Sequence, residues 1–318
     1  MKKDNQRLTN PYAYSDSNKR YQTYDYYLRS LFGGKCAKVS LDAGFTCPNI
    51  DGTVSRGGCI YCKNGSSGAS GETLFEQYRR GAEVAKRKWG CDKFIPYLQA
   101  HTNTYAPADV LRDLYFRAAS FDGAVMLAIA TRADCLPDDV VALLDEVSKT
   151  IPLTVELGLQ STRDDTAEKI NRGHTFNDFI AGYEKLRRKA PDVKIAIHLI
   201  NGLPGESDVD MVKSAVDVAA LRPDVVKLHL LHIMSETALE KMWRRGEYVP
   251  MEQEEYVRVI CDQIERLPPE CAVGRVTGDA REDDLLAPLW CRRKTAVAND
   301  IDKELYRRGT YQGKFFNE

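Results

Sequence analysis

Short apolar runs alternate with helical patterns through the middle of this 318-residue chain, and this alternation constrains its fold more than any other feature. Strands that are apolar throughout are typical of sheets covered on both faces, and strands that alternate with helices form parallel sheets. The predicted strands are residues 38–43, 94–99, 124–130, 153–158, 194–200 and 225–231. The predicted helices are residues 72–89, 108–119, 138–149, 164–170, 176–189 and 208–220. Six such units predict an α/β fold, a partial (β/α)6 TIM-like barrel.

Segments of different character flank this barrel and predict three parts. Residues 1–35 form a helical segment with six tyrosines, and residues 36–235 form the barrel. Residues 236–318 form a small C-terminal α+β extension with a helix over 251–267 and a strand over 273–278 that extends the sheet. The tyrosine spacing fits an amphipathic helix that covers the core. The alternative is that tyrosine rings stack on unpaired bases.

The composition is that of a globular protein without a strong charge. Lys and Arg number 45 and Asp and Glu number 46, so net charge does not by itself favour a nucleic-acid partner. The nine cysteines have irregular spacing, no apolar run opens the chain, and none is long enough to span a membrane. These features predict a cytoplasmic protein with reduced thiols and no membrane partner.

Cys47, Cys59 and Cys62 lie in one glycine-rich segment directly after the first predicted strand. Three interpretations are open: a [4Fe–4S] cluster with one iron left free for S-adenosylmethionine (SAM), a zinc knuckle completed by a distant residue, and cysteines that are simply buried. In barrels of this kind the chemistry lies at the C-terminal ends of the strands. Because the cysteine segment falls on that face, the cluster is favoured.

Polar residues follow the other predicted strands and would face the same end of the barrel. A single histidine can equally be a satisfied core residue, but several at strand ends indicate a site. The candidates for catalysis, or for the rim of a substrate pocket, are His101, Tyr105, His198 and His232.

Several short motifs resemble the radical SAM part of the Elp3-related enzymes. They are residues 131–134 (TRAD), 156–161 (ELGLQS), 171–175 (NRGHT) and 202–206 (GLPGE). The eleven residues between Cys47 and Cys59, and residues 227–233 (KLHLLHI) and 286–291 (LAPLWC), are similar to the YtqA/YhcC-like branch. The resemblance implies a radical SAM barrel and runs from about residue 28 to residue 295.

The resemblance implies a [4Fe–4S] cluster held by Cys47, Cys59 and Cys62, with SAM bound to its open iron. A glutamine amide can serve both hydroxyls of a ribose, and an arginine fork suits a carboxylate. The residues expected to bind SAM are Thr102, Asn103, Glu156, Gln160, Arg172 and Gly202.

The sequence departs from the family pattern in three places. Residues 101–104 (HTNT) stand where relatives have a Gly-Gly-Glu-like segment, so the SAM amino group would rest on Thr and Asn oxygens or backbone carbonyls there. Ala130 stands where Elp3 sequences carry Glu. Fewer than 90 residues follow His232, so the Elp3 acetyltransferase domain, and with it acyl transfer, is not expected.

The resemblance also implies a reaction. An electron donor such as flavodoxin or ferredoxin would reduce the cluster, SAM would yield a 5′-deoxyadenosyl radical, and the substrate would be wobble uridine 34 of tRNA. The implied step converts 5-carboxymethylaminomethyl(-2-thio)uridine to the 5-aminomethyl form. Two alternatives stay open: a radical SAM enzyme with a small-molecule substrate, and a zinc-stabilised nucleic-acid-binding module without catalysis.

Basic clusters could line a tRNA phosphate path, or they could be ordinary solvated surface. The clusters are residues 79–80, 86–88, 187–189, 244–245, 292–294 and 307–308.

Overall fold

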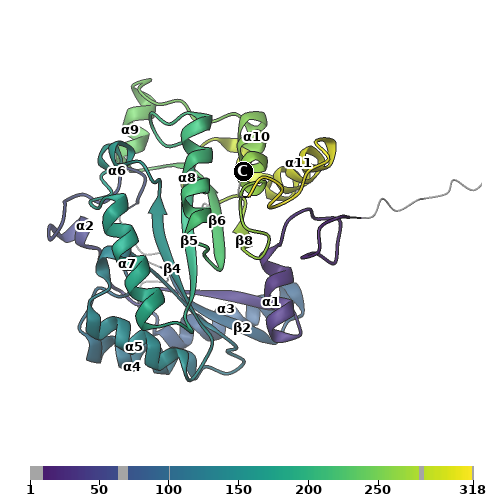
Figure 1. The fold of residues 1–318 in the computed structure, drawn as a ribbon. Coiled ribbons are helices and arrows are strands. Elements are labelled where there is room, and N and C mark those ends of the chain that lie inside the picture. The colour runs from purple at the N-terminus through teal and green to yellow at the C-terminus, as the bar shows by residue number, and fades with distance from the viewer. Residues whose placement is uncertain (1–9, 64–70, 100, 279–282, 317–318) are drawn as a thin grey trace, which may run out of the picture.

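The computed structural model describes residues 10–63, 71–99, 101–278 and 283–316. Its centre is a curled parallel sheet of seven strands in the order β1-β2-β3-β4-β5-β6-β8 (Figure 1). These strands are β1 (Cys36–Leu41), β2 (Lys93–Leu98), β3 (Leu127–Thr131), β4 (Leu153–Gln160), β5 (Lys194–Asn201), β6 (Val225–Leu230) and β8 (Ala272–Arg275). A separate antiparallel pair joins β7 (Ile233–Met234) to β9 (Leu285–Ala287). The predicted partial barrel is confirmed, with β8 as its seventh strand.

Helices cover the outer face of this sheet, as the predicted alternation requires (Figure 1). In chain order, the first six helices are α1 (Tyr24–Phe32), α2 (Pro48–Asp51), α3 (Leu74–Trp89), α4 (Ala108–Ala119), α5 (Asp138–Ser148) and α6 (Asp164–Lys169). Of these, α1 and α2 border the interior of the half-barrel instead of its outer face. The others are α7 (Phe176–Lys189), α8 (Asp208–Ala220), α9 (Ala238–Arg244), α10 (Gln253–Ile264) and α11 (Lys294–Arg307), with short 3₁₀ turns at Ala133–Cys135 and Leu289–Arg292.

Capping residues explain why helix starts could be predicted well. Thr175 caps α7 by accepting a hydrogen bond from the Asp178 N–H, and Asp178 bonds back to the Thr175 N–H. Ser207 and Asp210 form the same capping box at the start of α8. Each box satisfies backbone donors that the first helical turn leaves unpaired. The predicted bounds of both helices are therefore those of the structure.

The strands of the half-barrel present two different faces. In β5, Ile195, Ile197 and Leu199 are almost fully buried in the main hydrophobic core, while His198 lines an interior cavity. Full burial of one such aliphatic side chain contributes about 1.5–3 kcal/mol. The outer face thus stabilises the fold, which leaves the inner face available for polar side chains.

Helix α1 packs against both β1 and β8, the first and last strands of the sheet. The Val273 N–H donates to the Gln22 carbonyl at 2.8 Å, which joins the residues before α1 to β8. Leu28 packs with Ile95 and Tyr97 of the β2 inner face, and Tyr24 contacts the same cluster. The predicted N-terminal helix is therefore present and packs on the core, and Tyr24 also lines the interior cavity. The alternative that tyrosine rings stack on bases stays a prediction.

The three-part division with boundaries at residues 35 and 235 stays a prediction, and residues 1–9 of its first part lie outside the described residues. The extension shares structure with the barrel, because β8 pairs with β6 and α10 packs on α8. Within the described residues, no helix combines the length and the apolarity that crossing a membrane would require.

Candidate active site

A cavity of about 880 Å³ lies on the inner face of the curled sheet. Its size is in the range typical of ligand pockets, about 300–1,000 Å³. The residues predicted as site residues that line it are Cys47, Cys59, Cys62, His101, Thr102, Glu156, Gln160, Arg172 and His198. The fold therefore brings together side chains from four strands, β1, β2, β4 and β5, or from the segments that follow them.

The cysteine segment begins after β1 and folds over one end of the cavity. Cys47 precedes the short helix α2, and the Cys62 N–H donates to the Cys59 carbonyl at 2.9 Å. Cys59 is buried, and a hydrogen bond between its thiol and that of Cys62 lowers the pKa of Cys59 well below its ordinary range. The electropositive Arg172 nearby acts in the same direction, so this thiol is prepared to become a thiolate ligand.

Asn171 holds the long segment between Cys47 and Cys59 in place. Its side chain accepts from the Ser55 hydroxyl at 2.7 Å and donates to the carbonyls of Arg56 and Gly58 at 3.1 and 2.8 Å. Its backbone has φ +54°, a left-handed conformation that asparagine tolerates better than most residues. One residue after α6 and its cap thus fastens a loop that is more than 100 positions away in the sequence.

Gly173 lets this loop approach closely. A Cβ at Gly173 would lie 2.2 Å from Asn49 Oδ1, closer than atoms can pack. Asn49 is buried; its side-chain amide donates to the Asn171 carbonyl and lies 3.7 Å from the Cys59 sulfur. Glycine at position 173 is therefore required for the contact between the cysteine loop and the segment that carries Arg172.

Gln160 and Arg172 meet across Gly158 at the end of β4. Arg172 donates to the Gly158 carbonyl, and a Cβ at Gly158 would lie 2.8 Å from Gln160 Nε2 and 3.1 Å from Arg172 Nη2. Gln160 has φ +80° and follows an irregularity in the β4–β5 pairing. The predicted pair therefore does converge in the cavity. Buried Arg132, paired with Asp134 at 2.7 Å, supports it by donating to the Arg172 carbonyl at 2.8 Å.

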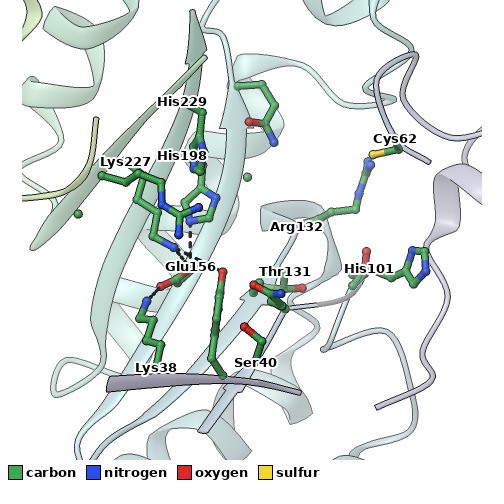
Figure 2. A pocket seen from close by; sticks show the side chains of 18 of the residues that line it. Lys38, Ser40, Cys62, His101, Thr131, Arg132, Glu156, His198, Lys227 and His229 are labelled. Carbon is green, nitrogen blue, oxygen red and sulfur yellow. Dashed lines mark hydrogen bonds and ion pairs between the residues drawn. The ribbon is translucent and has the colours of Figure 1, made fainter. Parts of the chain in front are cut away.

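A second polar group lies deeper in the barrel, around Glu156 of β4 (Figure 2). Its carboxylate is 1% exposed and accepts hydrogen bonds from Lys38 of β1, from Lys227 of β6 at 2.5 Å and from His198 of β5 at 3.1 Å. Lys38, Glu156 and Lys227 are called the two-lysine cluster below. Cys62 and His101 lie across the cavity from it in Figure 2.

Burial and the nearby charges lower the pKa values of Glu156, Lys227 and His198, each by a different balance of the two causes. Burial alone would raise the pKa of Glu156, but the ammonium groups of Lys227 and Lys38 outweigh it and hold that pKa well below its usual range. Burial lowers the pKa of Lys227 to about 7, although Glu156 opposes the shift. Burial and the nearby Lys227 charge lower the pKa of His198 to about 4. His198 is therefore neutral at physiological pH, while Glu156 is ionised.

Four predicted site residues do not reach this cavity. Asn103 turns its amide to the carbonyls of Leu98 and Ala130, where it ties the ends of β2 and β3 together. Gly202 accepts from the Tyr248 hydroxyl at 2.7 Å outside the barrel interior.

Tyr105 and His232 likewise lie elsewhere. Tyr105 borders a separate groove and donates to Thr53 Oγ1 at 2.8 Å, because it lies beyond the turn that follows β2. His232 lies past the end of β6 and packs against Gly278. The expectation that these two residues border the substrate cavity is not met by the structure, whereas His101 and His198 line it.

Strand-end reasoning missed the residues that lie inside strands. Lys38 and Ser40 of β1, and Lys227 and His229 of β6, line the cavity from alternate positions. Alternate residues of a strand point to the same face. A polar residue at every second position of an otherwise apolar run was therefore the available signal.

The residues present fit an iron–sulfur cluster with SAM. Thiolates favour iron–sulfur centres, and three of them leave one iron open. In the described part of the chain, no three His, Cys, Asp or Glu side chains are grouped tightly enough to hold one metal ion. Arg172 Nε is also buried without a partner among the described residues, as expected of a donor that awaits a ligand.

Comparison with known proteins gives consistent matches. Residues 52–218 match the family model described as the Radical SAM superfamily, and residues 223–307 match the Radical_SAM C-terminal domain. YtqA of Bacillus subtilis is 44% identical over 311 residues, covering 96% of each chain. A tRNA uridine(34) acetyltransferase of Methanocaldococcus jannaschii is 32% identical over 158 residues, covering 49% of this chain and 28% of the relative.

A solved structure has the same fold. The archaeal Methanocaldococcus infernus Elp3 with an N-terminal deletion superposes with a TM-score of 0.66 at 21% identity, covering 87% of this chain and 64% of that one. The shared fold includes the half-barrel that carries the cavity described above.

Proposed function

We propose, because this chain belongs to the radical SAM superfamily and to its Elp3-related branch, that it modifies the wobble uridine of tRNA by radical chemistry. Membership of the family, which the sequence motifs predicted, is confirmed. Radical SAM enzymes use a [4Fe–4S] cluster and SAM, so the predicted cofactors are confirmed at the level of the family.

Three kinds of side chain would hold these groups. Cys47, Cys59 and Cys62 would supply the thiolates of the cluster. Gln160 and Arg172, which meet at Gly158, would orient the ribose and carboxylate of SAM. When bound, the two cofactors together supply the removal of a hydrogen atom from a substrate carbon. The protein contributes enclosure, because the inner face of the sheet and helix α1 keep water from the reacting atoms.

The observation that carries a tRNA substrate is an exposed aromatic and basic edge of the cavity. Trp89, the last residue of α3, is 44% exposed and lines the cavity together with exposed Lys35. Lys86, Arg87 and Lys88 precede it and are all exposed, and Lys88 Nζ lies 5.2 Å from the Trp89 ring centroid. An exposed ring can stack on an unpaired base, and the cations beside the ring can neutralise the adjacent backbone phosphates.

Four of the other predicted basic clusters fit a tRNA path less well, and the fifth, residues 292–294, lies near the end of α3, where burial and the nearby charge of Lys88 lower the pKa of Lys294. Acidic partners take up Arg80, Arg187, Arg244 and Arg308, which pair with Glu72, Asp224, Glu240 and Glu304. The proposed contact with tRNA is therefore the end of α3. The M. jannaschii tRNA uridine(34) acetyltransferase, a relative over half of this chain, supports the choice of uridine 34.

The proposed reaction removes the carboxymethyl group of 5-carboxymethylaminomethyl(-2-thio)uridine. Its atoms balance if water adds to the departing carbon: substrate, SAM and water give 5-aminomethyl(-2-thio)uridine, glyoxylate, methionine, 5′-deoxyadenosine and a proton. The substrate loses the two electrons that SAM gains. A small electron donor such as flavodoxin or ferredoxin is the proposed partner that starts the cycle. We place the reaction in the cytoplasm.

The test is anaerobic turnover of the cluster-loaded enzyme with dithionite, SAM and tRNA with or without the carboxymethylaminomethyl group. The expected result is 5′-deoxyadenosine, glyoxylate and the lighter nucleoside in equal amounts, only with the modified tRNA. Replacing Trp89 with alanine should weaken tRNA binding about tenfold, the usual effect of losing one stacked base. The variant Phe75→Ala, which removes another exposed ring of α3, is the control. If 5′-deoxyadenosine forms but every tRNA stays unchanged, the tRNA proposal is wrong.

A further inference from the structure

Two buried ammonium groups share one carboxylate at the end of the cavity away from the cysteines, which is called the lysine end below. Lys38 and Lys227 both bond to Glu156, and the side chains of Lys227 and Glu156 are 7% and 1% exposed. The ammonium groups lie 4.5 and 5.0 Å from the centroid of the Tyr97 ring, which helps to hold them side by side. When both lysines are protonated, positive charge within the two-lysine cluster exceeds negative charge by one.

The neighbouring histidines are either neutral or positively charged, so they do not balance this excess of positive charge. Burial keeps both His198 and His229 neutral, since it lowers their pKa values. His229 lines the cavity, and its Nε2 has no hydrogen-bond partner among the described residues. A buried charge without a counter-ion is costly, and an ammonium group has three donors. Glu156 takes one donor from each lysine, and the Tyr97 hydroxyl, 3.4 Å from Lys227 Nζ, takes a second from Lys227. The cluster therefore has unused donors and room for one anion.

The position of the cluster fits a substrate better than a cofactor. Glu156 precedes Gln160 by four residues along β4, so it lies roughly 13 Å deeper in the barrel than the strand end. The cysteine segment follows the end of β1, and Cys62 lies across the cavity from Glu156 (Figure 2). Trp89 and Lys35 precede β2 and β1, so they border the cavity at the end of the strands away from the cysteines. A molecule that enters past them would meet Lys38 and Lys227 before it reaches the cofactors.

We propose that Lys38 and Lys227 bind a carboxylate of the substrate, which completes the charge balance of the two-lysine cluster. This inference rests on the proposed function, under which that carboxylate is the terminal group of the carboxymethylaminomethyl arm. Binding there fixes the arm by its end and leaves the carbon next to the carboxylate in the open part of the cavity. The cluster then distinguishes the modified uridine from uridines that lack the acid.

The experiment compares two tRNAs that differ only in this group: one with the free carboxylate and one in which it has been converted to the methylamide. Dissociation constants are measured with cluster-loaded enzyme for the wild type, Lys227→Met, Lys227→Arg and the surface control Lys213→Met, which alters an exposed ion pair of α8. The wild type and the control should prefer the carboxylate about tenfold, as expected for one charge-assisted hydrogen bond. Lys227→Met should remove the preference, and Lys227→Arg should keep part of it.

A second variant guards against misfolding. Lys227→Met leaves Glu156 with Lys38 alone, so the double variant Lys227→Met/Glu156→Gln, with less buried charge, is measured in parallel for iron content and melting temperature. Loss of the preference in a folded variant supports the inference. An unchanged preference in both variants, while the wild type still releases glyoxylate from tRNA, overturns the inference and leaves the proposed function intact. A wild type that converts neither tRNA overturns both.

Discussion

The two ends of the cavity are held together in different ways. At the cysteine end, a loop of glycines is fixed by backbone and amide hydrogen bonds to Asn171 and Ile170. At the lysine end, Lys38, Glu156 and Lys227 lie on β1, β4 and β6, three strands of the same sheet. The difference shows that contacts from one distant segment hold the cysteine end, whereas the register of the sheet itself preorganises the lysine end.

The largest expected effect follows from removing a cluster ligand. Cys59→Ser should abolish cluster binding and all 5′-deoxyadenosine formation, because three thiolates are the minimum for this cluster. Cys36→Ser is the matched control, since Cys36 lines the same cavity from β1 but is not a predicted ligand. Iron and sulfide analysis after anaerobic reconstitution measures the effect. Retention of a full cluster in Cys59→Ser would refute the ligand assignment, while loss in both variants would point to general misfolding.

A change at the lysine end should instead lower the stability of the protein. Glu156→Gln removes the carboxylate that two buried lysines share, which should cost about 3 kcal/mol in the free energy of unfolding, the lower part of the range for a broken buried ion pair. The cost stays in the lower part of that range because Lys227 can lose its proton, which leaves less charge buried without a partner. Anaerobic urea unfolding monitored by circular dichroism provides the measurement.

Glu146→Gln is the comparison for this loss. Glu146 pairs with Arg112 on the surface, where both side chains are 47% exposed, so the same change should cost about 0–1 kcal/mol. Equal stability of the two variants would show that the barrel does not depend on the two-lysine cluster.

The loop that carries the cysteines should be weakened separately by Asn171→Ala. This change removes the side-chain bonds to Ser55, Arg56 and Gly58 and places a residue with a stronger preference against positive φ at φ +54°. Loss of iron to a chelator should become about tenfold faster, as is usual when a group that orients metal ligands is removed. Asn171→Gly keeps the backbone conformation accessible and isolates the side-chain part. Iron loss at the wild-type rate in both variants would mean that the loop is held by other contacts.

The same contrast explains what the sequence allowed one to predict. The sequence predicted that the cysteine segment, Gln160 and Arg172 lie at one site, and the structure places them in one cavity. This was possible because each belongs to a short motif whose spacing is visible along the chain. The helices α4, α7 and α8 were predicted with the bounds that the structure has, because their apolar spacing and, for α7 and α8, their capping residues are local.

The two-lysine cluster could not be predicted in this way. Lys38 and Lys227 come together only through the register of a seven-stranded sheet that bends into a half-barrel, and no local pattern gives that curvature. Tyr105 and His232 were misplaced for a related reason. Each follows a strand closely, but the direction of the chain after the strand decides which side of the sheet the side chain reaches.

The smallest predicted effect is a pH dependence of stability that arises from Lys227 at the lysine end. Burial lowers the pKa of Lys227 to about 7, against an ordinary value of 10.5. Between these values the unfolded state binds more protons than the folded state, so stability increases as pH rises. From pH 7 to pH 8 the gain should be roughly 1 kcal/mol, or about 2 °C in melting temperature. The titratable or charged groups that face Lys227 are Glu156, Lys38, His198, His229, Tyr97 and Arg275.

Among the facing groups whose pKa is shifted, none is expected to titrate in this window. The pKa of His198 is about 4, that of His229 is also lowered, and those of Tyr97 and Lys38 are raised. The measurement is the melting temperature of the wild type and of Lys227→Met at both pH values under anaerobic conditions, because titration of the cysteine thiols cancels in the difference between the two proteins. The rise should be about 2 °C larger in the wild type. Equal changes of melting temperature in the two proteins would place the pKa of Lys227 outside this window. If that pKa lies above the window, both lysines of the lysine end are charged at neutral pH before any substrate enters.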